Sequence, residues 1–160
     1  MALPAKRRIA MVLVSGAVVA GVAGCGGGSS SNSRLSHSEL VSKANAACQK
    51  ANTTVAALQS PTDNAGLASY SSKLAAATGQ MEQQIASLKP PSSDERSIGA
   101  YLAALRQSNA LLAQLRSAAQ QGNTGQVREI GTQLQAIGIG ALAARAGLGS
   151  CATPPATKAS

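Results

Sequence analysis

The stretch LASYSSKLAAATGQMEQQIASL, residues 67–88, decides the fold class of this 160-residue chain. Apolar side chains recur in it at steps of three and four residues: Leu67, Tyr70, Leu74, Ala77, Met81, Ile85 and Leu88. Such steps place these side chains on one face of an α-helix, which has about 3.6 residues per turn. A half-buried strand would alternate apolar and polar residues, and no segment of the chain shows strict alternation. The stretch therefore predicts an amphipathic helix.

Three further segments carry the same periodicity, and together they predict an all-α domain. The apolar positions are Leu40, Ala44, Ala47, Ala51, Val55 and Leu58 in the first segment; Ile98, Leu102, Leu105, Leu112 and Leu115 in the third; and Val127, Ile130, Leu134, Ile137, Ala141, Ala144 and Leu148 in the fourth. Asn109 is a polar interruption of the third apolar face. Because short connections make successive helices antiparallel, we expect an up-down-up-down bundle of four helices of about 22 to 29 residues.

Residues that favour helix starts precede each segment. A Ser or Asn followed three residues later by Glu or Gln can cap a helix, and proline suits the first helical position. The expected starts are Ser36 with Glu39, Ser60 with Pro61 and Asp63, Ser92 with Glu95, and Asn123 with Gln126. Pro90 and Pro91 are expected to end the second helix and Gly122 the third, and Gly138 and Gly140 predict a kink in the fourth.

The first 24 residues have the layout of a secretory signal. Lys6, Arg7 and Arg8 give a basic start, and residues 9–23 form an uncharged, mainly apolar run. This run is shorter than the roughly 20 residues of a membrane-spanning helix. The tetrapeptide Val22-Ala23-Gly24-Cys25 then resembles the lipobox of bacterial lipoproteins. The resemblance implies cleavage before Cys25, a diacylglyceryl group and fatty acyl chains such as palmitate on that residue, and a lipid-anchored position at the extracytoplasmic face of the cell membrane. An uncleaved N-terminal anchor is the alternative.

The lipidated cysteine is followed by a segment with little apolar character. Residues 26–33 contain only Gly, Ser and Asn, which bury too little apolar area to offset the entropy of ordering the chain. We therefore expect a flexible tether over residues 25–35, a helical domain over 36–152 and a flexible C-terminal tail over 153–160.

The composition predicts a thin apolar core and a basic surface. The chain has no Phe or Trp, so Tyr70 and Tyr101 are its only aromatic residues. Three of the 14 basic residues lie in the signal, and the 11 that remain, with the six acidic residues, give the mature chain a net charge of +5. The basic residues form no narrow stripe at helical spacing, so no nucleic-acid partner is expected. Apart from the membrane, an envelope protein or an anionic wall polymer would suit a basic exported domain.

Cys48 and Cys151 remain as a pair if Cys25 carries lipid. Paired cysteines in an exported chain predict a disulfide, which would close a loop of about 100 residues and stabilise the domain by about 4–5 kcal/mol on the chain-entropy estimate. Two buried free thiols are the alternative, and a metal site would lack further ligands. The bond requires the chain after the fourth helix to turn back along the first, which Gly147 and Gly149 permit.

Two windows around these cysteines resemble small lipoproteins of actinobacteria. Several of those proteins combine an early ANAxC stretch with a late LGxxC stretch. Here the stretches stand as Ala44-Asn45-Ala46-Ala47-Cys48 and Leu148-Gly149-Ser150-Cys151, the second being one residue shorter. The resemblance implies a small helical lipoprotein with a disulfide and no assigned activity.

No group of residues in the sequence predicts catalysis, a metal site or a cofactor. The run Gly138-Ile139-Gly140-Ala141-Leu142-Ala143 matches a dinucleotide fingerprint, but it lies inside a helical segment and no acidic residue follows it. Close helix packing is the preferred interpretation. The run Ser36-His37-Ser38 is expected to cap a helix, because a catalytic triad also needs an orienting acid. The six acidic residues are dispersed along the chain.

Tyr70 and Tyr101 are the candidate ligand-binding residues. Both are on apolar faces of adjacent predicted helices, where they either pack in the core or line a small pocket. The leading functional hypothesis is a non-catalytic, lipid-anchored domain that binds or scaffolds a partner at the cell envelope. The alternative is a small-ligand carrier or sensor with a cavity between helices around these two tyrosines.

Overall fold

The computed structural model describes residues 33–153, and within that range it contains six helices and no β-strand. The helices are α1 (His37–Ala56), α2 (Asn64–Ala86), α3 (Glu95–Gln120), α4 (Thr124–Ala136), α5 (Ile139–Arg145) and α6 (Gly149–Ala152). The predicted all-α class is confirmed. The expected signal, Cys25 and residues 154–160 lie outside the described range. No helix between residues 33 and 153 is long and apolar enough to span a bilayer.

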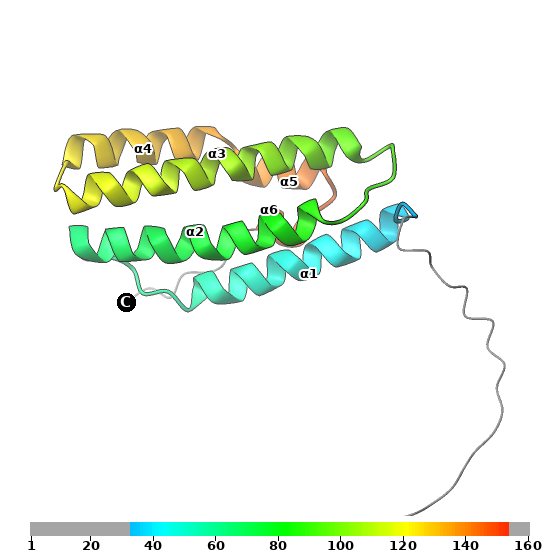
Figure 1. Cartoon of the computed structure of the whole chain (residues 1–160), viewed down its shortest axis with the longest axis horizontal. Coiled ribbons are helices and arrows are strands. Elements are labelled where there is room, and N and C mark those ends of the chain that lie inside the picture. Colours follow the sequence, from blue (N-terminus) through cyan, green and yellow to red (C-terminus); the bar gives the residue numbers. More distant parts are fainter. Residues whose placement is uncertain (1–32, 154–160) are drawn as a thin grey trace, which may run out of the picture. The chain divides into compact units, whose positions relative to one another are not determined.

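The helices pack mainly against their neighbours in the sequence (Figure 1). The long helix α2 packs against both α1 and α3, and α3 also packs against α4 and α5. The short helix α6 packs against α1 and α5. The C-terminal end of the helical region therefore lies beside the first helix, as formation of the expected disulfide requires.

The buried side chains form two core clusters. The larger cluster joins α1, the second half of α2, the first half of α3, α5 and the residues before α6. Its largest fully buried side chains are Leu40, Ile85, Tyr101, Leu105 and Leu148. The smaller cluster joins the second half of α3 to α4 through Leu111, Leu112, Leu115, Ala118 and Ile130. Alanines occupy many of the other buried positions, as the composition predicts.

The fourth predicted helix is not continuous, so this part of the prediction is wrong. Two glycines with left-handed backbone, Gly138 at φ +65° and Gly147 at φ +73°, divide it into α4, α5 and α6. Glycine adopts this conformation readily because it has no Cβ to collide with the neighbouring carbonyl. The expected kink near Gly138 is therefore a complete break, and the second break at Gly147 redirects the chain toward α1.

Two of the predicted helix starts are confirmed. At α1, the backbone N–H of Glu39 donates to Ser36 Oγ over 3.3 Å, and the backbone N–H of Ser36 donates to Glu39 Oε2 over 2.9 Å. Hydrogen bonds from the Ser36 hydroxyl and backbone lower the pKa of the Glu39 carboxyl. At α4, Asn123 Oδ1 accepts a 3.1 Å hydrogen bond from the backbone N–H of Gln126. Each of these caps forms between residues only three positions apart.

The predicted start of the second helix is three residues too early. The N-cap of α2 is Asp63, whose Oδ1 accepts a 2.6 Å hydrogen bond from the backbone N–H of Gly66. Ser60 and Pro61 therefore lie in the connection between α1 and α2. Aspartate caps a helix as well as serine does, and here it is the one that forms the bond.

The predicted start of the third helix is also wrong. Ser92 lies in a turn in which the backbone N–H of Asp94 donates to the Pro91 carbonyl oxygen over 2.9 Å, and α3 begins at Glu95. Asp94 makes no side-chain cap. Its carboxylate lies beside His37 instead, with 2.7 Å between Asp94 Oδ2 and His37 Nδ1. A tertiary contact has thus replaced the local cap.

Contacts with the helical domain begin before Ser36. The backbone N–H of Leu35 donates to the Lys89 carbonyl oxygen over 2.9 Å, and the Leu35 side chain packs against the larger core cluster. Arg34 Nη1 donates to the Pro90 carbonyl oxygen over 3.0 Å and also pairs with Glu95. Arg34 and Leu35 are therefore part of the folded domain.

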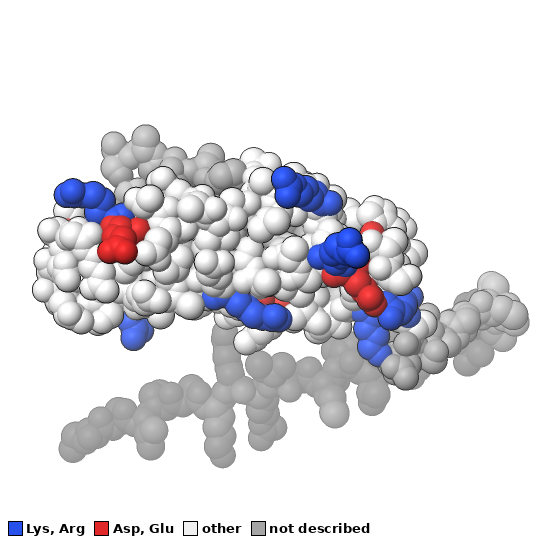
Figure 2. All heavy atoms as spheres, turned by 90° about the horizontal axis from the view of Figure 1, so that it is seen from above, with Lys and Arg blue, Asp and Glu red and all other residues white. Residues whose placement is uncertain are grey.

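Charged side chains are spread thinly over the face that Figure 2 shows. The Lys and Arg side chains stand mostly apart from one another, and acidic side chains accompany some of them (Figure 2). An ion pair joins α2 to α3, with 2.8 Å between Arg106 Nε and Glu82 Oε1. This face therefore offers no concentrated basic patch of the kind that nucleic-acid binding requires.

Candidate binding pocket beside the disulfide

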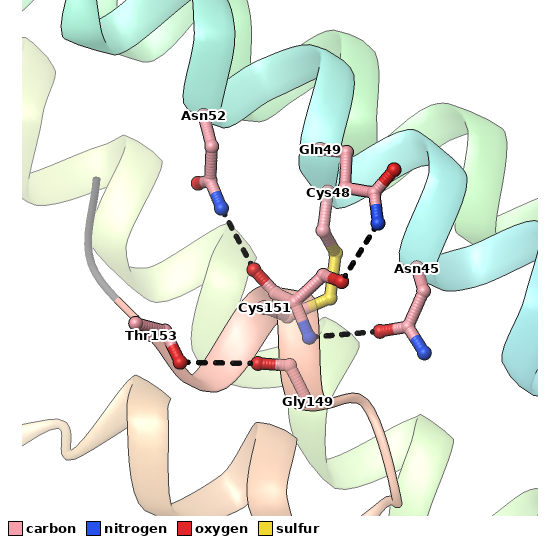
Figure 3. Close-up of a disulfide and its surroundings, with 8 residues drawn as sticks. Asn45, Cys48, Gln49, Asn52, Gly149, Cys151 and Thr153 are labelled. Atoms are coloured by element: carbon pink, nitrogen blue, oxygen red, sulfur yellow. Dashed lines mark hydrogen bonds between the residues drawn. A yellow bond between two sulfur atoms is a disulfide. The ribbon is translucent and has the colours of Figure 1, made fainter. Parts of the chain in front are cut away.

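A disulfide links Cys48 of α1 to Cys151 of α6, 103 positions later in the chain (Figure 3). The Cα atoms of the two cysteines are 5.1 Å apart, which is within the usual range for a disulfide. Cys48 is fully buried in the larger core cluster. The bond expected from the sequence is present, and Gly147 provides the turn that brings the chain back to α1.

Three polar side chains of α1 hold Ser150 next to the disulfide (Figure 3). Asn45 Oδ1 accepts a 3.0 Å hydrogen bond from the backbone N–H of Ser150. Asn52 Nδ2 donates to the Ser150 carbonyl oxygen over 2.7 Å, and Gln49 Nε2 donates to the Ser150 hydroxyl over 3.2 Å. Side chains three and four positions apart share one face of a helix, so α1 presents these groups and Cys48 together. A four-residue helix leaves most of its backbone groups without internal partners, and α1 supplies partners for the N–H and the carbonyl oxygen of Ser150.

Gly140 allows α5 to approach α6 closely. A Cβ atom at this position would lie 3.1 Å from the backbone carbonyl oxygen of Ala152, which is closer than most side chains tolerate. Gly138 lies between two helices, whereas a dinucleotide fingerprint needs a preceding strand. The structure therefore supports the packing interpretation for Gly140, whereas Gly138 provides the left-handed break between α4 and α5.

A mainly apolar pocket of about 250 Å³ lies between the helices beside the disulfide. Each of five helices contributes to its lining, with Val55 from α1, Leu74 and Met81 from α2, Tyr101 from α3, Ile139 from α5 and Cys151 from α6. Met81 and Tyr101 belong to the larger core cluster, and Leu74 packs against the smaller one. The pocket is therefore located where the two clusters meet, and no charged side chain of the described part of the chain lines it.

Tyr101 brings a polar group to this apolar lining. Its side chain is almost completely buried, with 1% relative exposure of the residue. Its hydroxyl has no hydrogen-bond partner among residues 33–153. In that range every fully buried polar side-chain atom has a partner, so a hydroxyl without one must keep some exposure. The hydroxyl is thus not completely enclosed, and Tyr101 is one of the residues that line the pocket. Burial raises the pKa of Tyr101 to about 12, so the hydroxyl keeps its proton at neutral pH.

The neighbouring polar groups of the lining already have protein partners. Thr78 Oγ1 is 2.5 Å from Asn109 Oδ1 and 2.9 Å from the Leu74 carbonyl oxygen. Asn109 Nδ2 in turn donates to Glu82 Oε2 over 3.4 Å, so the polar interruption of the third apolar face ties α3 to α2. Asn52 is held by its bond to Ser150.

Tyr70 does not line the pocket that contains Tyr101. It is half-buried and lies in a surface hollow of about 560 Å³ at the connection between α1 and α2, together with Pro61, Asp63 and Lys73. A single cavity around both tyrosines, as expected from the sequence, is therefore not what the structure contains. The two rings are on adjacent helices but face different spaces.

His37 has an acidic partner that sequence analysis missed. Asp94 lies beside its Nδ1, whereas Ser36 Oγ donates to Glu39 Oε2 over 2.6 Å as part of the helix cap. No serine hydroxyl is hydrogen-bonded to the His37 ring among the described residues. The arrangement therefore fixes the start of α1 against the turn before α3 and does not assemble a nucleophile.

The pocket is the best candidate for a functional site in residues 33–153, because no metal-binding group of side chains lies in that range. Between residues 33 and 153 no group of three or more His, Cys, Asp and Glu side chains could hold a metal ion. The roles of Asn45 and Asn52 beside the disulfide were also missed by sequence analysis, although their spacing from Cys48 on one helix face was a usable signal.

Comparisons of the chain with protein-family models, with curated proteins and with solved structures found no match.

Proposed function

We propose that the mature chain is a lipid-anchored, extracytoplasmic helical domain that binds a small apolar molecule and is not an enzyme. Its fold is best regarded as an up-down-up-down four-helix bundle whose last helix is broken into α4, α5 and α6. The lipobox-like residues before Cys25 support the anchor, because a diacylglyceryl group supplies the two acyl chains that stable membrane attachment needs.

The pocket between α1, α2, α3, α5 and α6 is the observation that carries the binding function. Small-molecule sites are concave, largely apolar and equipped with a few polar groups that fix orientation. The pocket beside Cys151 has this form, and the buried Tyr101 is one of the polar residues in its lining. This favours the carrier or sensor hypothesis over a scaffold with a completely filled core.

Scaffolding at the cell envelope is the second candidate, and α4 favours it. Within the described residues α4 packs closely against α3 and approaches no other helix. Its side chains Val127 and Leu134, and Ile137 at its end, are only half-buried. An envelope protein could cover this apolar side of α4, and cross-linking in native membranes from cysteines placed on α4 would identify it.

A pair of leucine substitutions on α2 tests ligand binding. Leu74 and Leu67 are both half-buried and seven positions apart on one face, but only Leu74 lines the pocket. Native mass spectrometry of the full-length wild-type chain, released gently from detergent, is expected to show a bound small molecule. Leu74→Trp fills the pocket and should abolish the adduct, whereas Leu67→Trp should retain it. An adduct of unchanged mass and occupancy in Leu74→Trp, or none in the wild type, would contradict the proposal.

The anchor is tested separately by Cys25→Ala. We expect the wild-type chain to incorporate a labelled fatty acid and to sediment with membranes after loss of its first 24 residues. The Cys25→Ala variant should incorporate no label. Labelling that persists in this variant would rule out Cys25 as the lipidated residue, without bearing on the pocket.

A further inference from the structure

The electrostatic character of the Tyr101 pocket restricts its occupant. Among residues 33–153 none of its lining side chains is charged, and its walls are mainly those of Leu, Val, Ile, Met and Ala residues. An ionised group inside such a space would lose its hydration without gaining a counter-ion, which is strongly unfavourable. The occupant is therefore expected to be uncharged.

The hydrogen-bonding state of the lining restricts the occupant further. Thr78 and Asn52 are already bonded to protein atoms, whereas the Tyr101 hydroxyl has no partner in the described range. A buried hydroxyl without a partner loses the hydrogen bonds that it would make in water, so a ligand that restores one is favoured. Because the hydroxyl remains protonated at neutral pH, it has an O–H to donate.

We infer that the pocket takes an uncharged, mainly hydrocarbon molecule with one hydrogen-bond acceptor, such as a carbonyl or ether oxygen, to which Tyr101 donates. This inference rests on the proposed binding function and specifies its ligand class. The pocket volume of about 250 Å³ is just below the usual range of small-molecule sites, roughly 300–1,000 Å³, so the molecule is compact. Met81 gives part of the wall a flexible, polarizable surface that suits a hydrocarbon body.

Three probes of similar size separate these requirements: acetophenone, which carries a carbonyl oxygen; ethylbenzene, which carries no acceptor; and benzoate, which is charged. Each is titrated into the full-length chain in detergent micelles, and amide chemical shifts of residues around the pocket report occupancy. Comparing variants at one micelle concentration cancels the partitioning of the probes into detergent. We expect acetophenone to bind more tightly than ethylbenzene, and benzoate to leave the pocket amides unshifted.

The decisive variant is Tyr101→Phe, which removes the hydroxyl and keeps the ring. It should weaken acetophenone binding by about two- to tenfold, the worth of one hydrogen bond, and leave ethylbenzene binding unchanged. Tyr70→Phe is the matched control and should change neither affinity, because Tyr70 lines a different hollow.

The outcomes separate the ligand class from the binding function itself. Equal effects of Tyr101→Phe on acetophenone and ethylbenzene would overturn the donor role of Tyr101 while leaving an apolar site in place. Tighter binding of benzoate than of acetophenone would overturn the requirement for an uncharged ligand. If no probe shifts the pocket amides of the folded wild-type chain, the proposed function fails together with this inference.

Discussion

The side-chain oxygen of Asn45 accepts a 3.0 Å hydrogen bond from the backbone N–H of Ser150, 105 positions further along the chain. With the Cys48–Cys151 bond it fastens the four-residue helix α6 to α1. A helix this short does not form by itself, because nucleation costs more than its few hydrogen bonds return. Since Cys151 lines the Tyr101 pocket, the pocket depends on this attachment.

Replacement of Asn45 tests the attachment. Asn45→Ala leaves the partly buried N–H of Ser150 without its acceptor, so we expect a loss of about 1 kcal/mol in the free energy of unfolding. Gln49→Ala removes a more exposed hydrogen bond to the same residue and should change this free energy by less than about 0.5 kcal/mol. Urea unfolding followed by circular dichroism measures both. Equal effects of the two substitutions would show that the Asn45 bond adds nothing specific.

Removal of the disulfide should be more costly. The double variant Cys48→Ala/Cys151→Ala lifts the restraint on a loop of 103 residues in the unfolded chain, and we expect it to lose about 2–5 kcal/mol. Cys25→Ala is the control, because Cys25 precedes the helical domain, and it should leave the unfolding free energy unchanged. A double variant as stable as the wild type in urea would contradict the structural role of the bond.

Local features of this fold could be read from the sequence because their causes are local. The spacing of apolar residues in α1, α2 and α3 follows the helical period, and the caps at Ser36 and Asn123 bond residues three positions away. The pairing of Cys48 with Cys151 followed from counting cysteines in an exported chain. Each of these predictions needed no knowledge of how distant segments pack.

The missed features depend on distant partners or on backbone conformation. The third helix was expected to begin at Ser92, but α3 begins three residues later, and Asp94, just before it, pairs with His37, 57 positions earlier. The break at Gly138 was seen only as a kink because the apolar spacing of the fourth segment continues across it, and spacing does not encode φ. Tyr101 was named as a candidate, but its separation from Tyr70 depends on where α1 and α5 lie relative to α2.

A pair of glycine substitutions with opposite expected effects tests the break before α6. Gly147 has φ +73°, and a Cβ there would meet Val41 Cγ2 at 3.8 Å, which is an ordinary contact. Gly147→Ala should therefore cost about 1–2 kcal/mol through backbone strain and not through crowding. Gly131 is inside α4, and a Cβ added there would have no neighbour within 4 Å. Since alanine has a higher helix propensity than glycine, Gly131→Ala should stabilise the domain by up to about 1 kcal/mol. Thermal and urea unfolding measure both. Destabilisation of similar size in the two variants would contradict this account.

The buried state of Tyr101 makes a prediction about alkaline pH. Its pKa is about 12 in the folded chain and about 10 when unfolded, so folding favours the protonated hydroxyl. The stability that follows from this difference is fully present below pH 10 and is lost as the pH rises from 10 toward 12, by about 2–3 kcal/mol in total. Tyr101→Phe has no hydroxyl to ionise and should not show this loss.

The comparison of wild type with Tyr101→Phe isolates the effect, because every other ionisable group titrates in both chains. Near pH 7 the two should differ by less than about 0.5 kcal/mol in unfolding free energy, since the hydroxyl has no hydrogen-bond partner to lose within residues 33–153. Between pH 10 and 11.5 Tyr101→Phe should become progressively more stable than the wild type in urea unfolding. A difference that stays constant across this range would mean that the hydroxyl ionises as easily in the folded chain as in the unfolded one. The phenol would then be in contact with bulk water and not enclosed at an apolar pocket.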